Sequence, residues 1–187
     1  VMANRPDYHN LLLVKLNGDV IAAGKSFNST NLADRKHFQQ ALAQKKFVAG
    51  EFIITRVGPK NQVFPFGYPV IDQHGQINGV LTGAIKLSLF QRFHELATLP
   101  ENGFIALTDS KGIRLLYYPE KATNPIGEPI NRSTWDMVKS AKELGYFVRK
   151  TSDGKQSLIA FEQIRLEPGS PPYIYVWAGI PENYIVQ

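Results

Sequence analysis

The side chains of this 187-residue chain that could do acid–base, nucleophilic or metal chemistry are scattered along the sequence. The four histidines are far apart, and no two of them have the HExxH spacing that holds a catalytic zinc ion on a helix. The sequence contains neither a Gly-x-Ser-x-Gly turn for a serine nucleophile nor a glycine-rich loop that cradles phosphate groups. Cysteine is absent, which excludes disulfides, thiolate nucleophiles and sulfur ligands. We therefore expect no enzyme activity in this chain, no metal site and no cofactor.

Arg35 is the charged residue best placed to bind a ligand. It stands where a short helix is predicted to begin, in residues 35–46. A planar guanidinium can donate two parallel hydrogen bonds to a carboxylate, and the partial positive charge of a helix start also favours an anion. The alternative, that Arg35 only pairs with a surface acid, remains open. Two residues further on, His37 has no second metal ligand at a suitable spacing, so a metal role is not expected.

The predicted helix has one apolar face. Phe38, Ala41 and Leu42 recur at helical spacing, and the Asp34 side chain can cap the helix start. Packing in the core is therefore the simplest role for Phe38.

A group of aromatic residues follows in a predicted strand. Phe64, Phe66 and Tyr68 alternate along it and therefore share one face of the sheet. Core filling explains them as well as a ligand pocket does. Glu51 and Arg56 flank the same region and are either pocket groups or solvent-facing charges, of which the solvent-facing role is favoured.

The composition is that of a folded domain, with 43% hydrophobic and 20% charged residues. The net charge is +5, but lysines and arginines are mixed with acids and form no long basic run. A nucleic-acid partner is therefore not expected. No stretch approaches the roughly 18 to 20 uninterrupted apolar residues of a membrane helix.

One plan of strands, turns and a helix occurs twice in the sequence. Each copy consists of a hairpin, an amphipathic helix and three further strands, joined near residues 96–102. The first copy has its hairpin at residues 11–24, around Asn17 and Gly18, and its strands at residues 47–57, 62–72 and 77–90. The second copy has its hairpin at residues 103–119 and its helix at residues 133–142, and a connecting helix is predicted at residues 90–97.

The segments ADRKHFQQALAQKKFVAGEFI, FGYPVIDQHGQINGVLTGAIKLS and VWAGIPENY resemble double-Cache sensor domains. Such domains lie outside the membrane in chemoreceptors, histidine kinases and diguanylate cyclases of bacteria and archaea. The resemblance covers nearly the whole chain and implies an α+β fold of two tandem PAS-like (Cache) modules. Each module would have an antiparallel five-stranded sheet with flanking helices. Residues 1–95 would be the membrane-distal, ligand-binding module, and residues 96–187 the membrane-proximal module that relays the signal.

The resemblance also implies a set of site residues. In amino-acid-binding members, an arginine at the helix start and an aromatic pair two and three residues later hold the ligand carboxylate. The corresponding positions here are Arg35, His37 and Phe38. A tyrosine and an aspartate in the next strand correspond to Phe52 and Ile54.

A further aspartate, which binds the ligand ammonium group in those members, corresponds to Lys86. A buried ammonium group without a counter-charge is unfavourable by roughly several kcal/mol, and a lysine would add repulsion. The expected ligand is therefore an organic anion rather than an α-amino acid. Phe52, Phe66 and Tyr68, together with Phe64, would surround its apolar part.

At the level of function, the resemblance implies the extracytoplasmic ligand-sensing domain of a transmembrane signal-transduction receptor: a histidine kinase of a two-component system, a diguanylate cyclase or a chemoreceptor of chemotaxis. A kinase or cyclase activity would then belong to a cytoplasmic part of the full-length receptor and not to this chain. The full-length receptor would be anchored in the cell membrane as a homodimer, with its membrane helices outside these 187 residues and this domain in the periplasm or outside the cell. The second module, with Trp135 and Met137 on its helix, is expected to be empty. The alternative is a protein-interaction or vestigial sensor module that has no small-molecule ligand.

Overall fold

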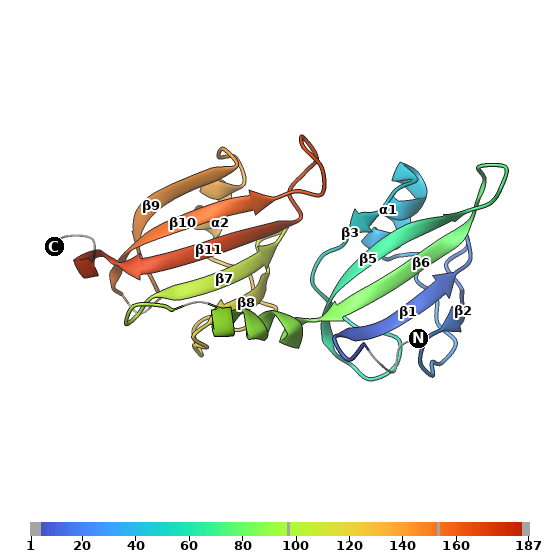
Figure 1. Cartoon of the computed structure of the whole chain (residues 1–187), viewed down its shortest axis with the longest axis horizontal. Coiled ribbons are helices and arrows are strands. Elements are labelled where there is room, and N and C mark those ends of the chain that lie inside the picture. Colours follow the sequence, from blue (N-terminus) through green and yellow to red (C-terminus); the bar gives the residue numbers. More distant parts are fainter. Residues whose placement is uncertain (1–4, 97, 153, 185–187) are drawn as a thin grey trace. The chain divides into compact units, whose positions relative to one another are not determined.

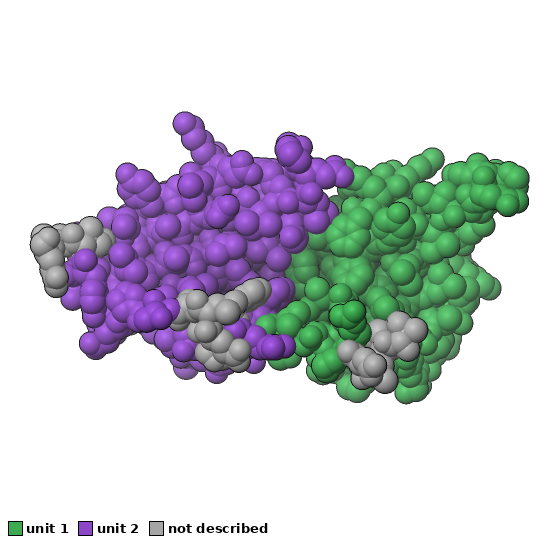
Figure 2. All heavy atoms as spheres, viewed as in Figure 1, with its two compact units in different colours: residues 1–89 green, residues 90–187 purple. Residues whose placement is uncertain are grey.

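The computed structural model describes residues 5–96, 98–152 and 154–184. The chain divides into two compact units, residues 1–89 (unit 1) and residues 90–187 (unit 2), which Figure 2 shows in separate colours. The division falls a few residues before the expected boundary at residue 95. Each unit is built on one antiparallel sheet with a short helix, so the predicted α+β fold of two tandem modules is confirmed.

Unit 1 is a sheet with one helix against one of its faces (Figure 1). In chain order its elements are β1 (Tyr8–Val14), β2 (Val20–Ala23), α1 (Lys36–Gln44), β3 (Val48–Ala49), β4 (Ile53–Ile54), β5 (Gln62–Ile71) and β6 (Ile77–Lys86). The strand order is β2-β1-β6-β5-β3, and β4 also pairs with β5. The predicted first hairpin is present, and its turn residue Gly18 has φ of 91°, which glycine adopts without strain.

The strand predicted at residues 47–57 is interrupted, which makes this sheet six-stranded rather than five-stranded. β3 and β4 each pair with β5, and residues 50–52 separate them. The Gly50 N–H donates to the Pro65 carbonyl at 2.8 Å, but proline has no N–H with which to return a hydrogen bond. The ladder is therefore broken opposite Pro65.

Helix α1 packs its apolar face on the sheet. His37, Phe38 and Ala41 are buried, and Leu42 packs against the same core. The helix approaches β5 closely at Gly67, where a Cβ atom would lie 2.6 Å from the His37 carbonyl oxygen. Only glycine fits at that position without a shift of the helix.

The start of α1 differs from the prediction that Asp34 caps it. Arg35 is the N-cap residue, and it makes no side-chain capping hydrogen bond. The Asp34 carboxylate instead accepts two hydrogen bonds from Arg56. The capping prediction is wrong because this guanidinium, distant in sequence, takes both carboxylate oxygens.

Unit 2 repeats the plan of unit 1, as predicted (Figure 1). Its elements are β7 (Phe104–Asp109), β8 (Arg114–Tyr118), α2 (Arg132–Val138), β9 (Leu144–Lys150), β10 (Gln156–Ile164), β11 (Ile174–Pro181) and the 3₁₀ helix η2 (Glu182–Tyr184). The strand order β8-β7-β11-β10-β9 is that of unit 1 without the additional short strand. The predicted connecting helix is a 3₁₀ helix, η1 (Leu87–Leu96), which begins three residues earlier than expected; residue 97 lies outside the described residues.

Helix α2 ends four residues earlier than predicted, but it has the cap that α1 lacks. The Asn131 side chain accepts hydrogen bonds from the backbone N–H groups of Ser133 and Thr134, at 3.0 and 3.3 Å. Trp135 packs edge-on against Tyr175 of β11, with ring centroids 4.8 Å apart. Among the described residues, no helix is long and apolar enough to cross a membrane.

Candidate functional site

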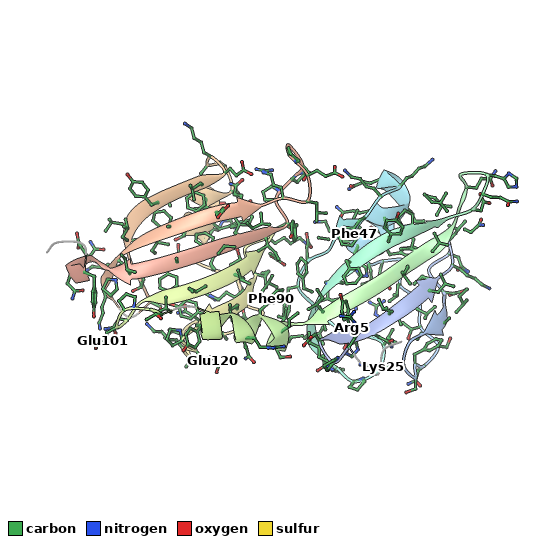
Figure 3. The ribbon with its side chains drawn as sticks, viewed as in Figure 1. Arg5, Lys25, Phe47, Phe90, Glu101 and Glu120 are labelled. Carbon is green, nitrogen blue, oxygen red and sulfur yellow. The ribbon has the colours of Figure 1, made fainter. Side chains whose placement is uncertain are left out.

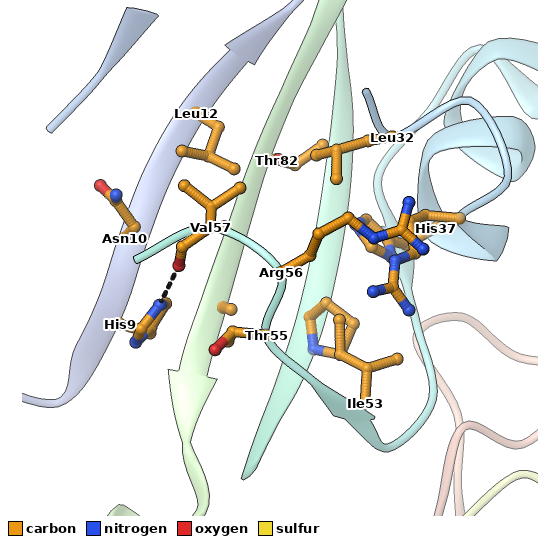
Figure 4. A pocket seen from close by; sticks show the side chains of 14 residues that line it. His9, Asn10, Leu12, Leu32, His37, Ile53, Thr55, Arg56, Val57 and Thr82 are labelled. Atoms are coloured by element: carbon orange, nitrogen blue, oxygen red, sulfur yellow. Dashed lines mark hydrogen bonds between the residues drawn. The ribbon is translucent and has the colours of Figure 1, made fainter. Parts of the chain in front are cut away.

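Unit 1 contains a small pocket beside the start of α1, with a volume of about 40 Å³. This is room for roughly three water molecules. The walls come from β1, the residues at the start of α1, the segment of residues 53–57, and strands β5 and β6 (Figure 4). The described lining residues are His9, Asn10, Leu12, Leu32, Arg35, His37, Ile53, Thr55, Arg56, Val57, Pro65, Thr82, Gly83 and Ala84.

Arg35 lines this pocket with an unsatisfied donor. Its Nε atom is buried and has no hydrogen-bond partner among the described residues. A buried donor without an acceptor is unfavourable by about 1 to 3 kcal/mol. Burial, followed by the positive charge of Arg56, lowers the pKa of Arg35, while Asp34 opposes the shift. This guanidinium is therefore suited to bind an anionic partner, to which its Nε–H can donate a hydrogen bond.

Arg56 lies in the same pocket, but its charge is balanced (Figure 4). It donates to both carboxylate oxygens of Asp34, at 2.8 and 2.9 Å, and to the Asn31 carbonyl at 3.0 Å. The hydrogen bonds from Arg56 hold the pKa of Asp34 below its usual value. The pair ties the segment after β4 to the residues that precede α1.

The two histidines of the pocket are held in different ways. His37 is 5% exposed, and burial, followed by the charge of Arg35, lowers its pKa to about 4. It is therefore neutral near pH 7. The Nε2 atom of His9 lies 2.8 Å from the Val57 carbonyl, to which it is hydrogen-bonded (Figure 4). No cluster of three or more potential metal ligands occurs in the part of the chain that the structure describes.

Acidic side chains are missing from the described lining of this pocket. Glu51, a buried acid nearby in sequence, forms an ion pair with Lys36 instead. The expectation that Glu51 is solvent-facing therefore does not hold. With Arg35 unpaired at Nε and no carboxylate in the lining, the pocket suits a negative group better than an ammonium group.

Only part of the expected ligand set lies in this pocket. Arg35 and His37 line it. Phe38 is 2% exposed and belongs to the core under α1, as its helical spacing predicts. Ile54 is 53% exposed outside the described lining, and its neighbour Ile53 takes the pocket-facing place.

The other expected residues also lie outside the described lining. Phe66 and Tyr68 share one face of β5, as predicted, but Pro65 and Gly67 are the β5 residues that face the pocket and α1. The Phe66 ring packs against the rings of Tyr8 and Phe47, at centroid distances of 6.2 and 5.8 Å (Phe47 is labelled in Figure 3). Tyr68 is 52% exposed, and Phe52 and Lys86 are half-buried without lining the pocket.

Sequence reasoning missed several polar residues in the lining. His9, Thr55 and Thr82 are buried there, and Asn10 uses its side-chain oxygen to accept from the backbone of Leu11. A polar residue inside an otherwise apolar segment was the signal that could have indicated them, because a buried polar group needs a hydrogen-bond partner.

The family follows from comparison with known proteins. A family model described as Cache domain, of the double-Cache type, matches residues 1–187. The chain belongs to the double-Cache family. The resemblance to double-Cache domains that the sequence indicated is therefore confirmed. The family is one of sensor domains rather than catalytic domains. The comparison with curated proteins gave no match.

Solved structures of similar fold are sensor domains of receptors. The extracellular domain of a candidate histidine kinase, rpHK1S-Z16, has a TM-score of 0.73 and 20% identity, over 100% of this chain and 76% of that one. The periplasmic sensory domain of the Campylobacter jejuni chemoreceptor Tlp1 has a TM-score of 0.67 and 15% identity, over 97% and 74%. The ligand-binding domain of the Pseudomonas aeruginosa PAO1 amino acid chemoreceptor PctB in complex with L-Arg has a TM-score of 0.70 and 15% identity, over 95% and 73%.

Proposed function

We propose that this chain is the extracytoplasmic ligand-sensing domain of a transmembrane signal-transduction receptor, and that unit 1 binds a short organic anion through Arg35. The observation that supports this proposal most strongly is the buried Nε of Arg35, which has no hydrogen-bond partner among the described residues. The position outside the membrane rests on the similar solved structures, which are extracellular or periplasmic domains. In the full-length receptor, we propose, this domain belongs to a membrane-anchored homodimer.

The proposed ligand is a carboxylate without an amino group. PctB, a similar structure, is described with an amino acid bound. In this chain the described lining has no acidic side chain, and the positions that correspond to the two amine-holding acids are Ile54 and Lys86. An ammonium group in this pocket would face Arg35 without a counter-charge, which is strongly unfavourable in a buried site. A carboxylate would satisfy the Nε donor instead.

The small volume of the pocket restricts the size of the ligand. A volume of about 40 Å³ is far below the roughly 300 Å³ of drug-sized sites, so a chain of few carbons fits best. Leu12, Leu32 and Ile53 supply an apolar wall for it.

Signalling in this proposal is a shift between two states of unit 1. A ligand changes that equilibrium only by its difference in affinity for the two states. The Arg56–Asp34 pair links two segments beside the pocket, which are the segments that a bound anion would draw together.

The test is a calorimetric and thermal-shift comparison of propionate, alanine and propylamine. Propionate is expected to bind and to raise the unfolding temperature, because a ligand present at a hundredfold of its dissociation constant stabilises by about 2.7 kcal/mol. Alanine and propylamine, which carry the ammonium group, are expected to bind at least about tenfold more weakly. Tighter binding of alanine would contradict the proposal. If no organic acid, amine, sugar or purine had any effect, a protein-interaction or vestigial module would be the better reading.

A further inference from the structure

Unit 2, the module that is expected to hold no ligand, contains a second pocket. Its volume is about 290 Å³, close to the roughly 300 Å³ at which small-molecule sites begin. Its walls come from β7, β8, β10 and β11, from residues 149–152, and from residues of the segment that leads into α2. An adjoining hollow shares Tyr117 and Asn124 with it.

The floor of this pocket is a row of aromatic side chains on the sheet. Ala106 of β7 pairs in register with Tyr117 on one side and with Trp177 on the other. The Phe104 ring also lines the pocket and stacks on Tyr117, with centroids 5.2 Å apart and an angle of 13° between the rings. The indole N–H of Trp177 donates to Thr108 Oγ1 at 3.1 Å, which fixes that ring. The floor is therefore flat, apolar and rigid.

Two arginines also line the pocket, and their described partners are neutral. Arg149 donates to Thr134 Oγ1 at 2.7 Å and to the Ser133 hydroxyl. Arg114 donates to the Pro129 carbonyl at 3.0 Å. Among the described residues, neither arginine forms an ion pair, and no acidic side chain lines the pocket. The guanidinium groups are therefore held in place by neutral hydrogen-bond acceptors.

Burial makes the charged form of Arg114 less favourable and lowers its pKa. Tyr117 and Glu128 oppose this shift by smaller effects, so the charge of Arg114 is only partly compensated. Lys150 is a third basic residue in the lining. Asn124, which is 7% exposed, donates to Ser152 Oγ at 3.0 Å and adds a fixed amide to the wall.

We infer that unit 2 holds a second ligand site, which takes a small anion with a flat apolar body, and that an aromatic carboxylate is the fitting chemical class. The ring would lie against Tyr117, Trp177 and Phe104, because aromatic faces pack favourably at such distances. The carboxylate would face Arg149 and Arg114, whose planar forks suit two oxygens. This site is separate from the Arg35 pocket, so either site can be tested without the other.

Tryptophan fluorescence reads out this site selectively. The chain has two tryptophans, Trp135 and Trp177, and both belong to unit 2. In a Trp135→Phe background the remaining signal comes from Trp177, on the floor of the pocket. Sodium benzoate is the probe, and benzamide is its neutral counterpart of the same shape. We expect saturable quenching by benzoate, with benzamide at least about tenfold weaker because it lacks the charge.

Three variants locate the binding. Ala106→Leu fills the floor between Tyr117 and Trp177 and is expected to abolish the benzoate response. Arg149→Gln removes the charge while an amide remains to contact the Thr134 hydroxyl, and it is expected to weaken benzoate by roughly tenfold or more. Arg132→Gln is the matched control, because it removes an arginine that is 93% exposed and outside the described lining.

Two results would overturn the inference. One is the absence of any saturable benzoate response in the folded parent. The other is a response that survives both Ala106→Leu and Arg149→Gln but disappears in Arg35→Ala, which would place the benzoate in unit 1. Circular dichroism of each variant shows whether it is folded. If Ala106→Leu does not fold, Arg149→Gln with its Arg132→Gln control still decides the question.

Discussion

The two units share one strand order but present different chemistry beside their helices. In unit 1, α1 approaches β5 closely at Gly67, and the pocket beside it measures about 40 Å³, with an arginine that has one unsatisfied donor. In unit 2 the helix is shorter, the pocket measures about 290 Å³, and its two arginines are held by hydroxyl and carbonyl groups. A repeated fold therefore fixes where a pocket lies, whereas its side chains decide its size and charge.

The largest expected effect compares the buried core side chains that the two helices contribute. Phe38→Ala is expected to lower the free energy of unfolding by about 3 to 5 kcal/mol, because the ring is 2% exposed in the core. Val138, the buried residue of α2, is its counterpart in unit 2. Val138→Ala removes the equivalent of two methylene groups and is expected to lose about 1.6 kcal/mol from transfer alone. Denaturant titrations followed by circular dichroism measure both, and equal losses would remove this contrast between the helices.

The second effect depends on pH and concerns unit 1 alone. The pKa of His37 is about 4 in the folded chain, against 6.5 as its ordinary value, so the unfolded state binds more protons between these two values. Stability is therefore expected to fall as the pH decreases from about 6.5 to about 4, by roughly 3 kcal/mol in total. Unfolding titrations across this range should show a shallower slope for His37→Gln than for the parent. An identical slope would mean that His37 is not the titrating group.

The third effect concerns ligand affinity at the unsatisfied arginine. Arg35→Ala is expected to lose about 1.5 to 3 kcal/mol of propionate binding, a weakening of roughly tenfold to more than a hundredfold. Stability without ligand should change little, because the side chain does not cap α1 and its Nε has no partner among the described residues. Arg35→Lys should restore little affinity, since an ammonium group lacks the planar fork. Calorimetry measures the affinities. A loss of stability in Arg35→Ala without ligand would show that the residue is structural.

The smallest effect compares the two helix starts. Asn131 caps α2 through its side chain, so Asn131→Ala is expected to lose about 1 kcal/mol. At the start of α1 the Asp34 carboxylate binds Arg56 rather than the helix. Asp34→Asn, which keeps the shape but removes the charge, should therefore cost less than 1 kcal/mol, as is usual for an exposed pair. Thermal unfolding of both variants measures the difference, and a larger loss for Asp34→Asn would contradict this assignment.

The sequence predicted the repeated architecture because periodicity and turn residues are local signals. Asn17 and Gly18 marked the first hairpin, and Phe38 and Ala41 marked the buried face of α1. The break between β3 and β4 was not predicted, because it depends on Pro65, which lies on the partner strand.

The site was predictable only in part. Arg35 and His37, placed by the helix start, do line the pocket of unit 1, and Phe66 and Tyr68 do share a face. Alternation along a strand tells which residues share a face but not which face meets the helix. The pocket of unit 2 escaped prediction because Arg114 of β8, Trp177 of β11 and Arg149 of β9 come together only when the whole five-stranded sheet has formed, with β7 and β10 between their strands.

The break opposite Pro65 also has a thermodynamic consequence. Residues 50–61 run beside the pocket of unit 1, and within them only the two residues of β4 belong to a strand. A segment with so few ladder hydrogen bonds opens at a lower free energy than β5 or β6, and its amide hydrogens exchange with solvent sooner. Part of the wall of this pocket is therefore a unit held by side-chain hydrogen bonds, such as those of Arg56 to Asp34 and of His9 to Val57, rather than by a strand ladder. If a ligand orders such a unit, the conformational entropy of the segment decreases on binding. This change can alter the stability of neighbouring strands without any large displacement of the sheet.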